Sequence, residues 1–389
     1  MDKIHKKRTD LITLFLCGDV MTGRGIDQIL PHPSDPAIHE GYLKDARRYV
    51  EIAEKVNGPI PRFVAPGYIW GDAIGELENV APDVRVINLE ASVTKSDDYW
   101  KEKGIHYRMH PENIDCITAA KIAVCSLANN HVLDWGYAGL KETLETLRKA
   151  KIGGAGAGMN VNEAESPAMI EIEGKGRVVI FAFGSPTSGV PLNWAASQKG
   201  PGVNLLRNFS NDTIRRIRKK VQEVKEDRDI VVASIHWGGN WGYRVPQEEI
   251  DFAHQLIDEA VVDMIHGHSS HHVKGVEVYR DRLILYGCGD FLNDYEGISG
   301  YGYYRDDLGL MYFATMDSPT GKLVQLEMTP TQIKNFKVNR TSRQDVLWLA
   351  NVLDREGKKF GTGVRLDEDN RLTLLWDRSQ MDAEMNDEP

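Results

Sequence analysis

The sequence predicts an α/β fold, in which helices cover a central sheet. Short apolar runs rich in β-branched residues recur along the chain, and helical segments alternate with them. Runs that are apolar at every position are typical of strands buried on both faces. These runs lie at residues 11–17, 84–89, 122–127, 177–183, 229–237 and 261–265.

Two segments between these runs have the features of amphipathic helices. Residues 138–150 place Leu140, Leu144 and Leu147 on one stripe and are followed by two glycines. Residues 246–260 begin with a proline and early acidic residues, as the start of a helix should. They also put Phe252, Leu256 and Ile257 on one face. Strand and helix therefore alternate through the middle of the chain.

We expect one domain over residues 1–330 and a C-terminal extension over residues 331–389. A Pro- and Gly-rich stretch around a helical segment, about residues 31–75, is interpreted as an insertion between the first two strands. A hairpin is expected at the end of the domain, at 308–317 and 322–330. The extension should contain a helix at 342–359, capped near Ser342 or Asp345, a strand at 371–376 and a disordered acidic tail.

Composition and charge exclude several classes of protein. The formal net charge is −10, which argues against a nucleic-acid backbone as the main partner. The apolar run at 11–17 is too short to span a membrane, and no small-residue cleavage site follows it. The four cysteines show neither CxxC spacing nor a disulfide framework. These features together predict a cytoplasmic protein.

Polar residues of the types that bind metals follow five of the predicted strands. Carboxylate, amide and imidazole groups at successive strand ends are expected where open α/β sheets place their sites. The mixture of oxygen and nitrogen ligands suits Mn, Fe or Zn, and no thiolate is placed to form a structural zinc site. The residues are Asp19, Asn88, Glu90, Asn129, Asn130, His131, His236, His266, His268, His271 and His272.

Each of these motifs also has a simpler interpretation when it is taken alone. A Gly-Asp after a strand is usually a turn, and Glu90 can be a carboxylate in the first turn of a helix. His236 beside a tryptophan can be a hydrogen-bonded core histidine, and a histidine-rich loop is a weak metal signal. The same residue types at the same end of five strands favour a metal site over these alternatives.

Six motifs resemble, in order, those of the bacterial CapA/PgsA poly-γ-glutamate capsule-synthesis family, within the calcineurin-like metallophosphatase superfamily. The matching stretch runs from about residue 11 to about residue 297. The resemblance implies a four-layer α/β/β/α sandwich with two mixed sheets. The motifs are GDVMTGRG, INLEASVT, LANNHVLDWGYAGLKETL, IHWGGNW, GHSSHHVKGVEVY and LILYGCGDF.

The resemblance also implies roles for individual residues. One metal would be held by Asp19, Glu90 and His271, and the other by Glu90, Asn130, His236 and His268. His131 would act as an acid or stabilise the transition state.

Two positions depart from the superfamily pattern. Met21 stands where a histidine ligand is expected, which leaves open whether one or two ions bind. Asp290 replaces the asparagine of a Gly-Asn-Phe ending, and is a candidate ligand, base or turn carboxylate.

A few further residues have two competing interpretations. Arg24 is predicted to hold an anionic substrate group or to be a structural salt-bridge partner. Asp134 is predicted to orient His131 or to cap the following helix. His272 is predicted to line the substrate pocket or to be packed, and residues 98–114 to form a pocket rim or a solvated loop.

The function expected from these features is a metal-dependent hydrolase in which a divalent ion activates water. Its catalytic residues would be His131, Asp134 and Asp290, with Arg24 and His272 binding substrate. The substrate would be a poly-γ-glutamate-like acidic polymer, a peptide or a small phosphorylated compound. The alternatives are a metal-dependent peptide Cα epimerase and a non-catalytic subunit of capsule biosynthesis.

Overall fold

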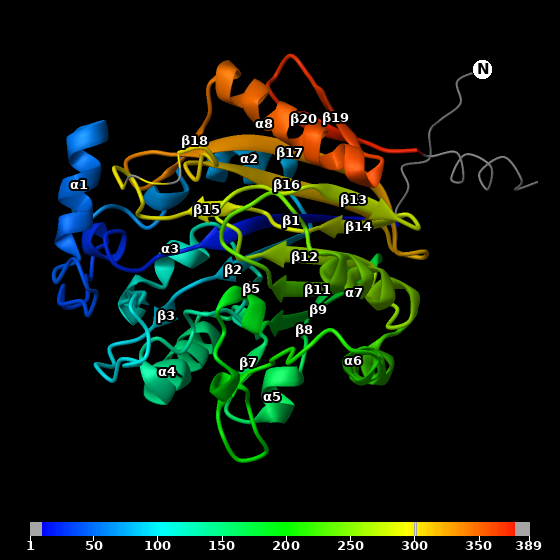
Figure 1. The fold of residues 1–389 in the computed structure, drawn as a ribbon, viewed down its shortest axis with the longest axis horizontal. Helices are drawn as coiled ribbons and strands as arrows, with labels where there is room; N and C mark the ends of the chain where they lie inside the picture. The colour runs from blue at the N-terminus through cyan, green and yellow to red at the C-terminus, as the bar shows by residue number, and fades with distance from the viewer. Residues whose placement is uncertain (1–9, 299, 301, 378–389) are drawn as a thin grey trace, which may run out of the picture.

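The computed structural model describes residues 10–298, 300 and 302–377. Its centre is formed by two mixed β-sheets, with helices around them (Figure 1). The larger sheet has the order β19-β20-β17-β16-β1-β2-β5-β6, with β15 paired to β1 and β18 paired to β17. Its strands are β1 (Leu11–Val20), β2 (Val84–Leu89), β5 (Val124–Ser126), β6 (Gly153–Ala155), β15 (Asp290–Leu292), β16 (Leu308–Asp317), β17 (Lys322–Ile333), β18 (Val338–Arg340), β19 (Gly363–Leu366) and β20 (Leu372–Leu375).

The smaller sheet has the order β13-β14-β12-β11-β9-β8, in which β9, β11, β12 and β14 are parallel. Its strands are β8 (Ala168–Ile172), β9 (Gly176–Gly184), β11 (Ile230–His236), β12 (Met264–His268), β13 (Val276–Tyr279) and β14 (Arg282–Leu285). Two short ribbons lie outside both sheets: β3 (Ser92–Val93) with β4 (Arg108–Met109), and β7 (Ala157–Gly158) with β10 (Gly202–Val203).

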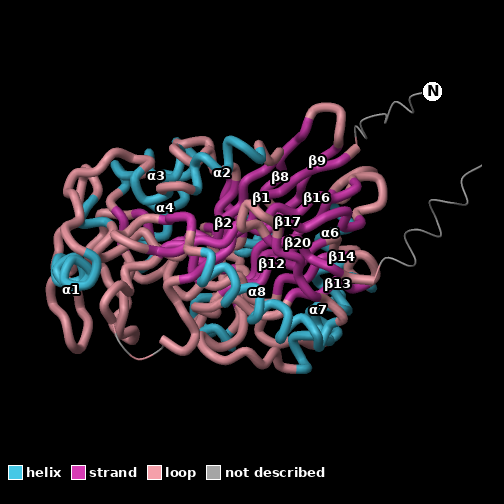
Figure 2. Tube along the Cα trace, turned by 90° about the horizontal axis from the view of Figure 1, so that it is seen from above, coloured by secondary structure: helices cyan, strands magenta, loops and turns pink. Residues whose placement is uncertain are grey.

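The helices lie around the outside of the strands, as the view from above shows (Figure 2). No helix among the described residues is both long and apolar enough to cross a bilayer. The α-helices are α1 (Arg47–Asn57), α2 (Ala73–Val80), α3 (Asp115–Thr118), α4 (Gly136–Lys149), α5 (Val161–Glu165), α6 (Asn211–Val224), α7 (Gln247–Asp258) and α8 (Arg343–Gly357). Short 3-10 helices lie at Asp27–Ile29, Tyr68–Trp70, Pro111–Asn113, Pro186–Ser188, Leu192–Trp194 and Lys358–Phe360.

Strands β9 and β11 divide their apolar side chains between two cores. Val179 and Val231 belong to a core that also contains the apolar faces of α6 and α7. Val178 and Val232 belong to the other core, which contains the strands of the larger sheet and residues of α2, α4 and α8. Side chains of a strand alternate between its faces, so the smaller sheet is covered by helices on one side and by the larger sheet on the other. The predicted four-layer α/β/β/α class is confirmed.

The C-terminal residues extend the larger sheet. Strand β17 runs through residue 330, where the sequence suggested a domain boundary, and β20 pairs with it. The predicted helix is α8, and its cap is Ser342, whose hydroxyl accepts the backbone N–H of Asp345. The expected insertion at 31–75 contains α1 and joins β1 to α2. The predicted tail lies outside the described residues from residue 378 onward.

The strand expected at 261–265 is shifted along the chain. Residues 261–263 have irregular backbone, in which Val261 has a φ of 60°. The Asp263 carboxylate accepts the backbone N–H of Val231 at 2.9 Å, which fixes the start of the neighbouring strand. Strand β12 begins at Met264 and continues to His268. His266 and His268 therefore lie on a regular strand rather than on a loop.

Candidate metal centre

The predicted ligands meet where strands of both sheets end. Asp19 lies near the end of β1 in the larger sheet, and His236 and His268 are the last residues of β11 and β12 in the smaller sheet. His236 and His268 are directly opposite each other in the parallel register. His266 joins the two sheets, because its Nε2 lies 2.8 Å from the carbonyl oxygen of Cys17. The site is therefore built at a sheet–sheet junction.

Three carboxylates, those of Asp19, Glu90 and Asp290, are at most 2% exposed at this junction. Asn88 Nδ2 donates to Asp19 Oδ1 at 2.8 Å and lies 3.2 Å from Glu90 Oε2. Asn129 fixes that amide by donating to Asn88 Oδ1 at 3.0 Å. Among the described residues, only histidines form ion pairs with these carboxylates. Buried negative charge therefore accumulates here without a lysine or arginine in the described chain that forms an ion pair with any of the three, although the charge of Lys103 acts on Glu90.

The electrostatics of the carboxylates reflect this imbalance. Burial, followed by repulsion from Asp290, raises the pKa of Asp19 to about 7. Burial and the charge of Asp19 likewise raise the pKa of Glu90. Because burying an unpaired charge is unfavourable, a bound cation would stabilise the ionised form of both groups.

Two imidazoles face these carboxylates from the smaller sheet. The Nδ1 atoms of His236 and His268 lie 2.9 Å apart, and His236 Nε2 is 3.2 Å from Asn130 Oδ1. Glu90 Oε1 lies 3.9 Å from the same His236 Nε2, and Asp19 Oδ1 lies 3.8 Å from His268 Nδ1. Burial lowers the pKa of both histidines, so the rings are neutral near pH 7 and retain a lone pair for an ion.

The third imidazole, His271, lies against Asp290. Its Nδ1 is 2.9 Å from Asp290 Oδ1, and its Nε2 is 3.0 Å from Asn240 Nδ2. Burial opposes a charge on His271, but the attraction of Asp290 outweighs it and raises the pKa of the ring. Asp290 in turn lies directly opposite Asp19 in the parallel pairing of β15 with β1.

These side chains fit a divalent cation. One ligand atom from each of Asp19, His236 and His268 can be chosen so that all lie within 4.8 Å of one another, and the same holds for Asp19, His271 and Asp290. Glu90 and Asn130 border the first group through their contacts with His236. Carboxylate, amide and neutral imidazole donors together suit Mn, Fe or Zn. The structure thus brings all six predicted metal ligands into one cluster.

His131 lies beside this cluster and is held by Asp134. Its Nδ1 is 2.6 Å from Asp134 Oδ2, while its Nε2 faces Glu90 Oε1 at 3.8 Å. Helix α4 has no side-chain cap, so Asp134 orients the histidine and does not cap the helix. Burial is the main cause that lowers the pKa of His131 to about 4. With its Nδ1 proton directed at Asp134, the neutral ring presents the Nε2 lone pair to the site.

Lys103 is a member of this cluster that the sequence interpretation missed. Its ammonium lies 2.5 Å from Asp134 Oδ1 and 3.3 Å from His131 Nδ1, and it also donates to the carbonyl of Asn130. The backbone N–H of Tyr107 donates to the remaining Asp134 oxygen at 2.7 Å. The middle of the 98–114 segment therefore packs against His131 and is not a solvated loop; its alternation of aromatic and cationic residues was the available signal.

Arg24 and His272 are both buried, and each contacts other side chains of the protein. Arg24 is 3% exposed and forms ion pairs with Glu40 and Asp294, which matches its salt-bridge interpretation. His272 is 1% exposed and stacks on Tyr304, with ring centroids 4.7 Å apart. A role for either in binding substrate stays a prediction.

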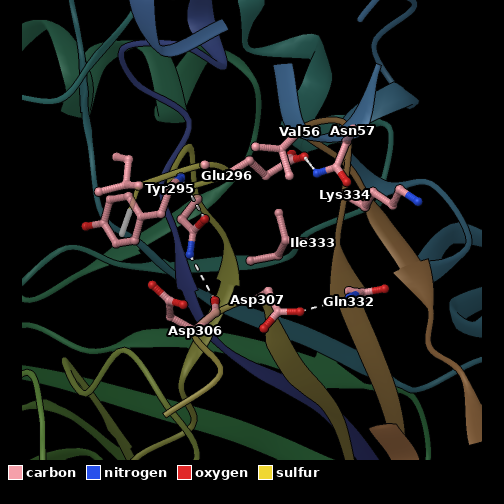
Figure 3. Close-up of a pocket in the computed structure, with 12 residues that line it drawn as sticks. Val56, Asn57, Tyr295, Glu296, Asp306, Asp307, Gln332, Ile333 and Lys334 are labelled. Atoms are coloured by element: carbon pink, nitrogen blue, oxygen red, sulfur yellow. Dashed lines mark hydrogen bonds between the residues drawn. The ribbon is translucent and has the colours of Figure 1, made fainter. Parts of the chain in front are cut away.

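A cavity of about 300 Å³ adjoins the cluster (Figure 3). Asn293 links the two, because it lines the cavity and donates to Asp290 Oδ2 at 2.7 Å. The walls carry the carboxylates of Glu296, Asp306 and Asp307 and one cation, Lys334. Burial, followed by repulsion from Asp290, raises the pKa of Asp306 to about 6. The cavity extends the negative character of the centre, so its own walls do not attract an acidic substrate.

Comparison with known families identifies the group to which this chain belongs. Residues 13–295 match the family described as "Bacterial capsule synthesis protein PGA_cap". The chain belongs to this family. The match spans every residue of the cluster, from Asp19 to Asp290.

Individual PGA_cap relatives match over nearly the whole chain. The "Probable polyglutamine synthesis accessory protein" of Mycobacterium tuberculosis is 43% identical over 367 residues, covering 94% of this chain and 96% of that protein. The "PGA biosynthesis protein CapA" of Bacillus subtilis is 27% identical over 379 residues, covering 97% of this chain and 86% of its own. Among solved structures, a "novel phosphatase" of Mycoplasma pneumoniae gives a TM-score of 0.45 at 12% identity, covering 82% of this chain and 93% of that one.

Proposed function

We propose that this PGA_cap chain is a metal-dependent enzyme of hydrolase type that acts on an acidic, poly-γ-glutamate-like polymer. The observation that carries the proposal is the cluster of three buried carboxylates and three histidines, in which no lysine or arginine of the described chain forms an ion pair with the carboxylates. The names of the two relatives support the class of polymer. Peptides and small phosphorylated compounds are the other substrates compatible with this chemistry.

The residues that would hold an ion in the first group are Asp19, Glu90, Asn130, His236 and His268. A divalent ion supplies Lewis acidity, which polarises a carbonyl or phosphoryl oxygen and makes water a stronger nucleophile. The neutral amide of Asn88 fixes the orientation of two of the carboxylates. Burial of the whole group excludes bulk water from the ligands, which strengthens their attraction for a cation.

His131 would accept and donate the proton of the reaction. Its Nδ1 is fixed by Asp134, so a proton is gained or lost at Nε2, the atom that faces Glu90 and the ligand cluster. A proton received there can be handed to the leaving group in the second half of the reaction. Lys103 binds the Asp134 oxygen that His131 leaves unused, and so helps to hold that carboxylate in place.

The test combines metal content with turnover. The purified protein should contain divalent metal at near-stoichiometric level and, loaded with Mn²⁺, should shorten poly-γ-glutamate or cleave bis(p-nitrophenyl) phosphate. His131→Asn should retain its metal and lose roughly 10²–10⁴-fold in rate. A metal-loaded protein that cleaves neither substrate would refute the hydrolase. Solvent deuterium entering a peptide Cα without cleavage would favour the epimerase instead.

A further inference from the structure

Met21, at the position where the resemblance expects a histidine ligand, packs among apolar residues. Met21 is 1% exposed and packs in a small apolar cluster with Ala91 and Tyr107. Its sulfur accepts the hydroxyl of Tyr295 at 3.6 Å. A thioether is a soft ligand, unsuited to the cations that prefer carboxylates. The ligand that the resemblance would place at this position is therefore missing from β1 and its following loop.

A carboxylate from a neighbouring strand stands in the same region. Asp290 on β15 is opposite Asp19 on β1, and the backbone N–H of Asp19 donates to the carbonyl of Gly289 at 3.0 Å. Asp290 Oδ1 lies 2.9 Å from His271 Nδ1, and Asn293 fixes its other oxygen. Asp19, His271 and Asp290 offer ligand atoms within 4.8 Å of one another, all from buried side chains.

The charges of the centre favour a second cation there. Once ionised, the three ligand carboxylates carry three negative charges, so one divalent ion would leave this ligand group with one negative charge. Lys103 acts on Glu90 from the His131 side, but its ammonium is paired with Asp134. An acidic polymer would then be repelled at the point where it must react. A second divalent ion makes the centre positive by one charge, which attracts a carboxylate or phosphoryl group. The neighbouring cavity, lined by Glu296, Asp306 and Asp307, cannot supply that attraction.

We propose that Asp290 is a metal ligand that completes a second divalent site with Asp19 and His271, so that the centre holds two ions. The proposal rests on the proposed function, because it assumes a first ion bound by His236 and His268. It differs from an orienting role, in which Asp290 would only hold the ring of His271 by accepting its Nδ1 proton. An asparagine oxygen could still accept that proton, but it cannot replace the negative charge of a ligand.

The experiment measures Mn²⁺ bound to the full-length protein by equilibrium dialysis and elemental analysis, with electron paramagnetic resonance on the same samples. The wild type should bind two ions per chain and show a spin-coupled pair. Asp290→Asn should bind one uncoupled ion, with the affinity for the second weakened by more than about 100-fold, beyond the 10–100-fold typical of an orienting residue. Asp306→Asn, a half-buried carboxylate of the same region outside the ligand group, is the matched control and should still bind two.

Several outcomes overturn the proposal. One is a wild-type protein that binds a single ion or shows two uncoupled ions, a result that needs no variant to fold. Another is a folded Asp290→Asn protein that keeps both ions.

Other outcomes separate the second site from the proposed function. Binding of no ion at all refutes both. Two coupled ions without turnover of any substrate leave the second site standing and refute the hydrolase alone. Inorganic phosphate should bind the loaded wild type at least tenfold more tightly than loaded Asp290→Asn; equal affinities would contradict the charge argument.

Discussion

The carboxylate of Asp134 offers a sharp test of how His131 is held. The side chain is fully buried and receives three donors: His131 Nδ1 at 2.6 Å, Lys103 Nζ at 2.5 Å and the backbone N–H of Tyr107 at 2.7 Å. Asp134→Asn can keep its acceptor oxygen at the Oδ2 position, which binds both His131 Nδ1 and the Tyr107 N–H, so it loses the bond of Oδ1 to Lys103. A bond to a charged group contributes about 1.5–3 kcal/mol, so losing the Lys103 bond costs about that much before relaxation.

Relaxation reduces this cost, because Lys103 is 15% exposed and can turn toward solvent. We expect the free energy of unfolding to fall by about 2 kcal/mol, within the range for one bond to a charged group. Urea unfolding at pH 7, followed by circular dichroism, measures the difference. The control is Asp97→Asn, whose carboxylate is 87% exposed although it pairs with Arg108 at 2.7 Å, and which should change stability little.

The pH dependence of that difference has a definite sign. Burial would raise the pKa of Asp134, but the charges of His131 and Lys103 outweigh it, so the pKa lies below its ordinary value. The stabilisation is therefore present above the unfolded pKa of about 3.9 and is lost as the pH falls through the lower folded value. A loss below about 1 kcal/mol at pH 7, or a difference between wild type and variant that grows on acidification, would refute the reasoning.

Three further predictions follow from the same structure. Arg24→Met should reduce the free energy of unfolding by about 3–5 kcal/mol, because it leaves the buried carboxylates of Glu40 and Asp294 without a cationic partner, and should leave the Mn²⁺ stoichiometry unchanged in dialysis. Gly18→Ala should lower the melting temperature and weaken Mn²⁺ binding in calorimetry, because a Cβ there overlaps the carbonyl oxygen of Gly289 beside Asp19. The rise in melting temperature on replacing EDTA with Mn²⁺ should be larger at pH 7.5 than at pH 5: the raised pKa of Asp19, about 7, makes the metal-free fold lose stability as the pH rises from about 4 toward 7, and the ion removes that loss; an equal or smaller rise at pH 7.5 would contradict this.

The ligand cluster was predictable because strand ends carry a signal. His236 follows an unbroken apolar run, and Asp19 follows another, so their place at the ends of strands could be inferred from the pattern, although the two strands lie in different sheets. Helix α6 was overlooked, although Ile214, Ile217 and Val221 have helical spacing. That segment carries its own signal, and a fuller count of apolar periodicity would have found it.

Other parts of the site had no local signal. Lys103 reaches Asp134 because Trp100 donates its backbone N–H to the Asp134 carbonyl at 2.8 Å, a contact between segments that share no pattern. The register that sets Asp290 against Asp19 depends on β15 returning to the larger sheet after the smaller one is complete. Such pairings between distant segments are decided by tertiary packing, which a single sequence does not display.

The central place of β1 has a consequence for the order of events during synthesis. Strand β1 is made before the other described strands, and it is flanked by β2 on one side and by β15 and β16, which are made much later, on the other. Asp19 is thus translated early, but its strand can pair on that side only after β15, which contains Asp290, has been made. The first candidate ion-binding group is complete only when His268 has been made, and the second only when Asp290 has been made. Either group can therefore bind an ion only after β11 and β12 of the smaller sheet have been made.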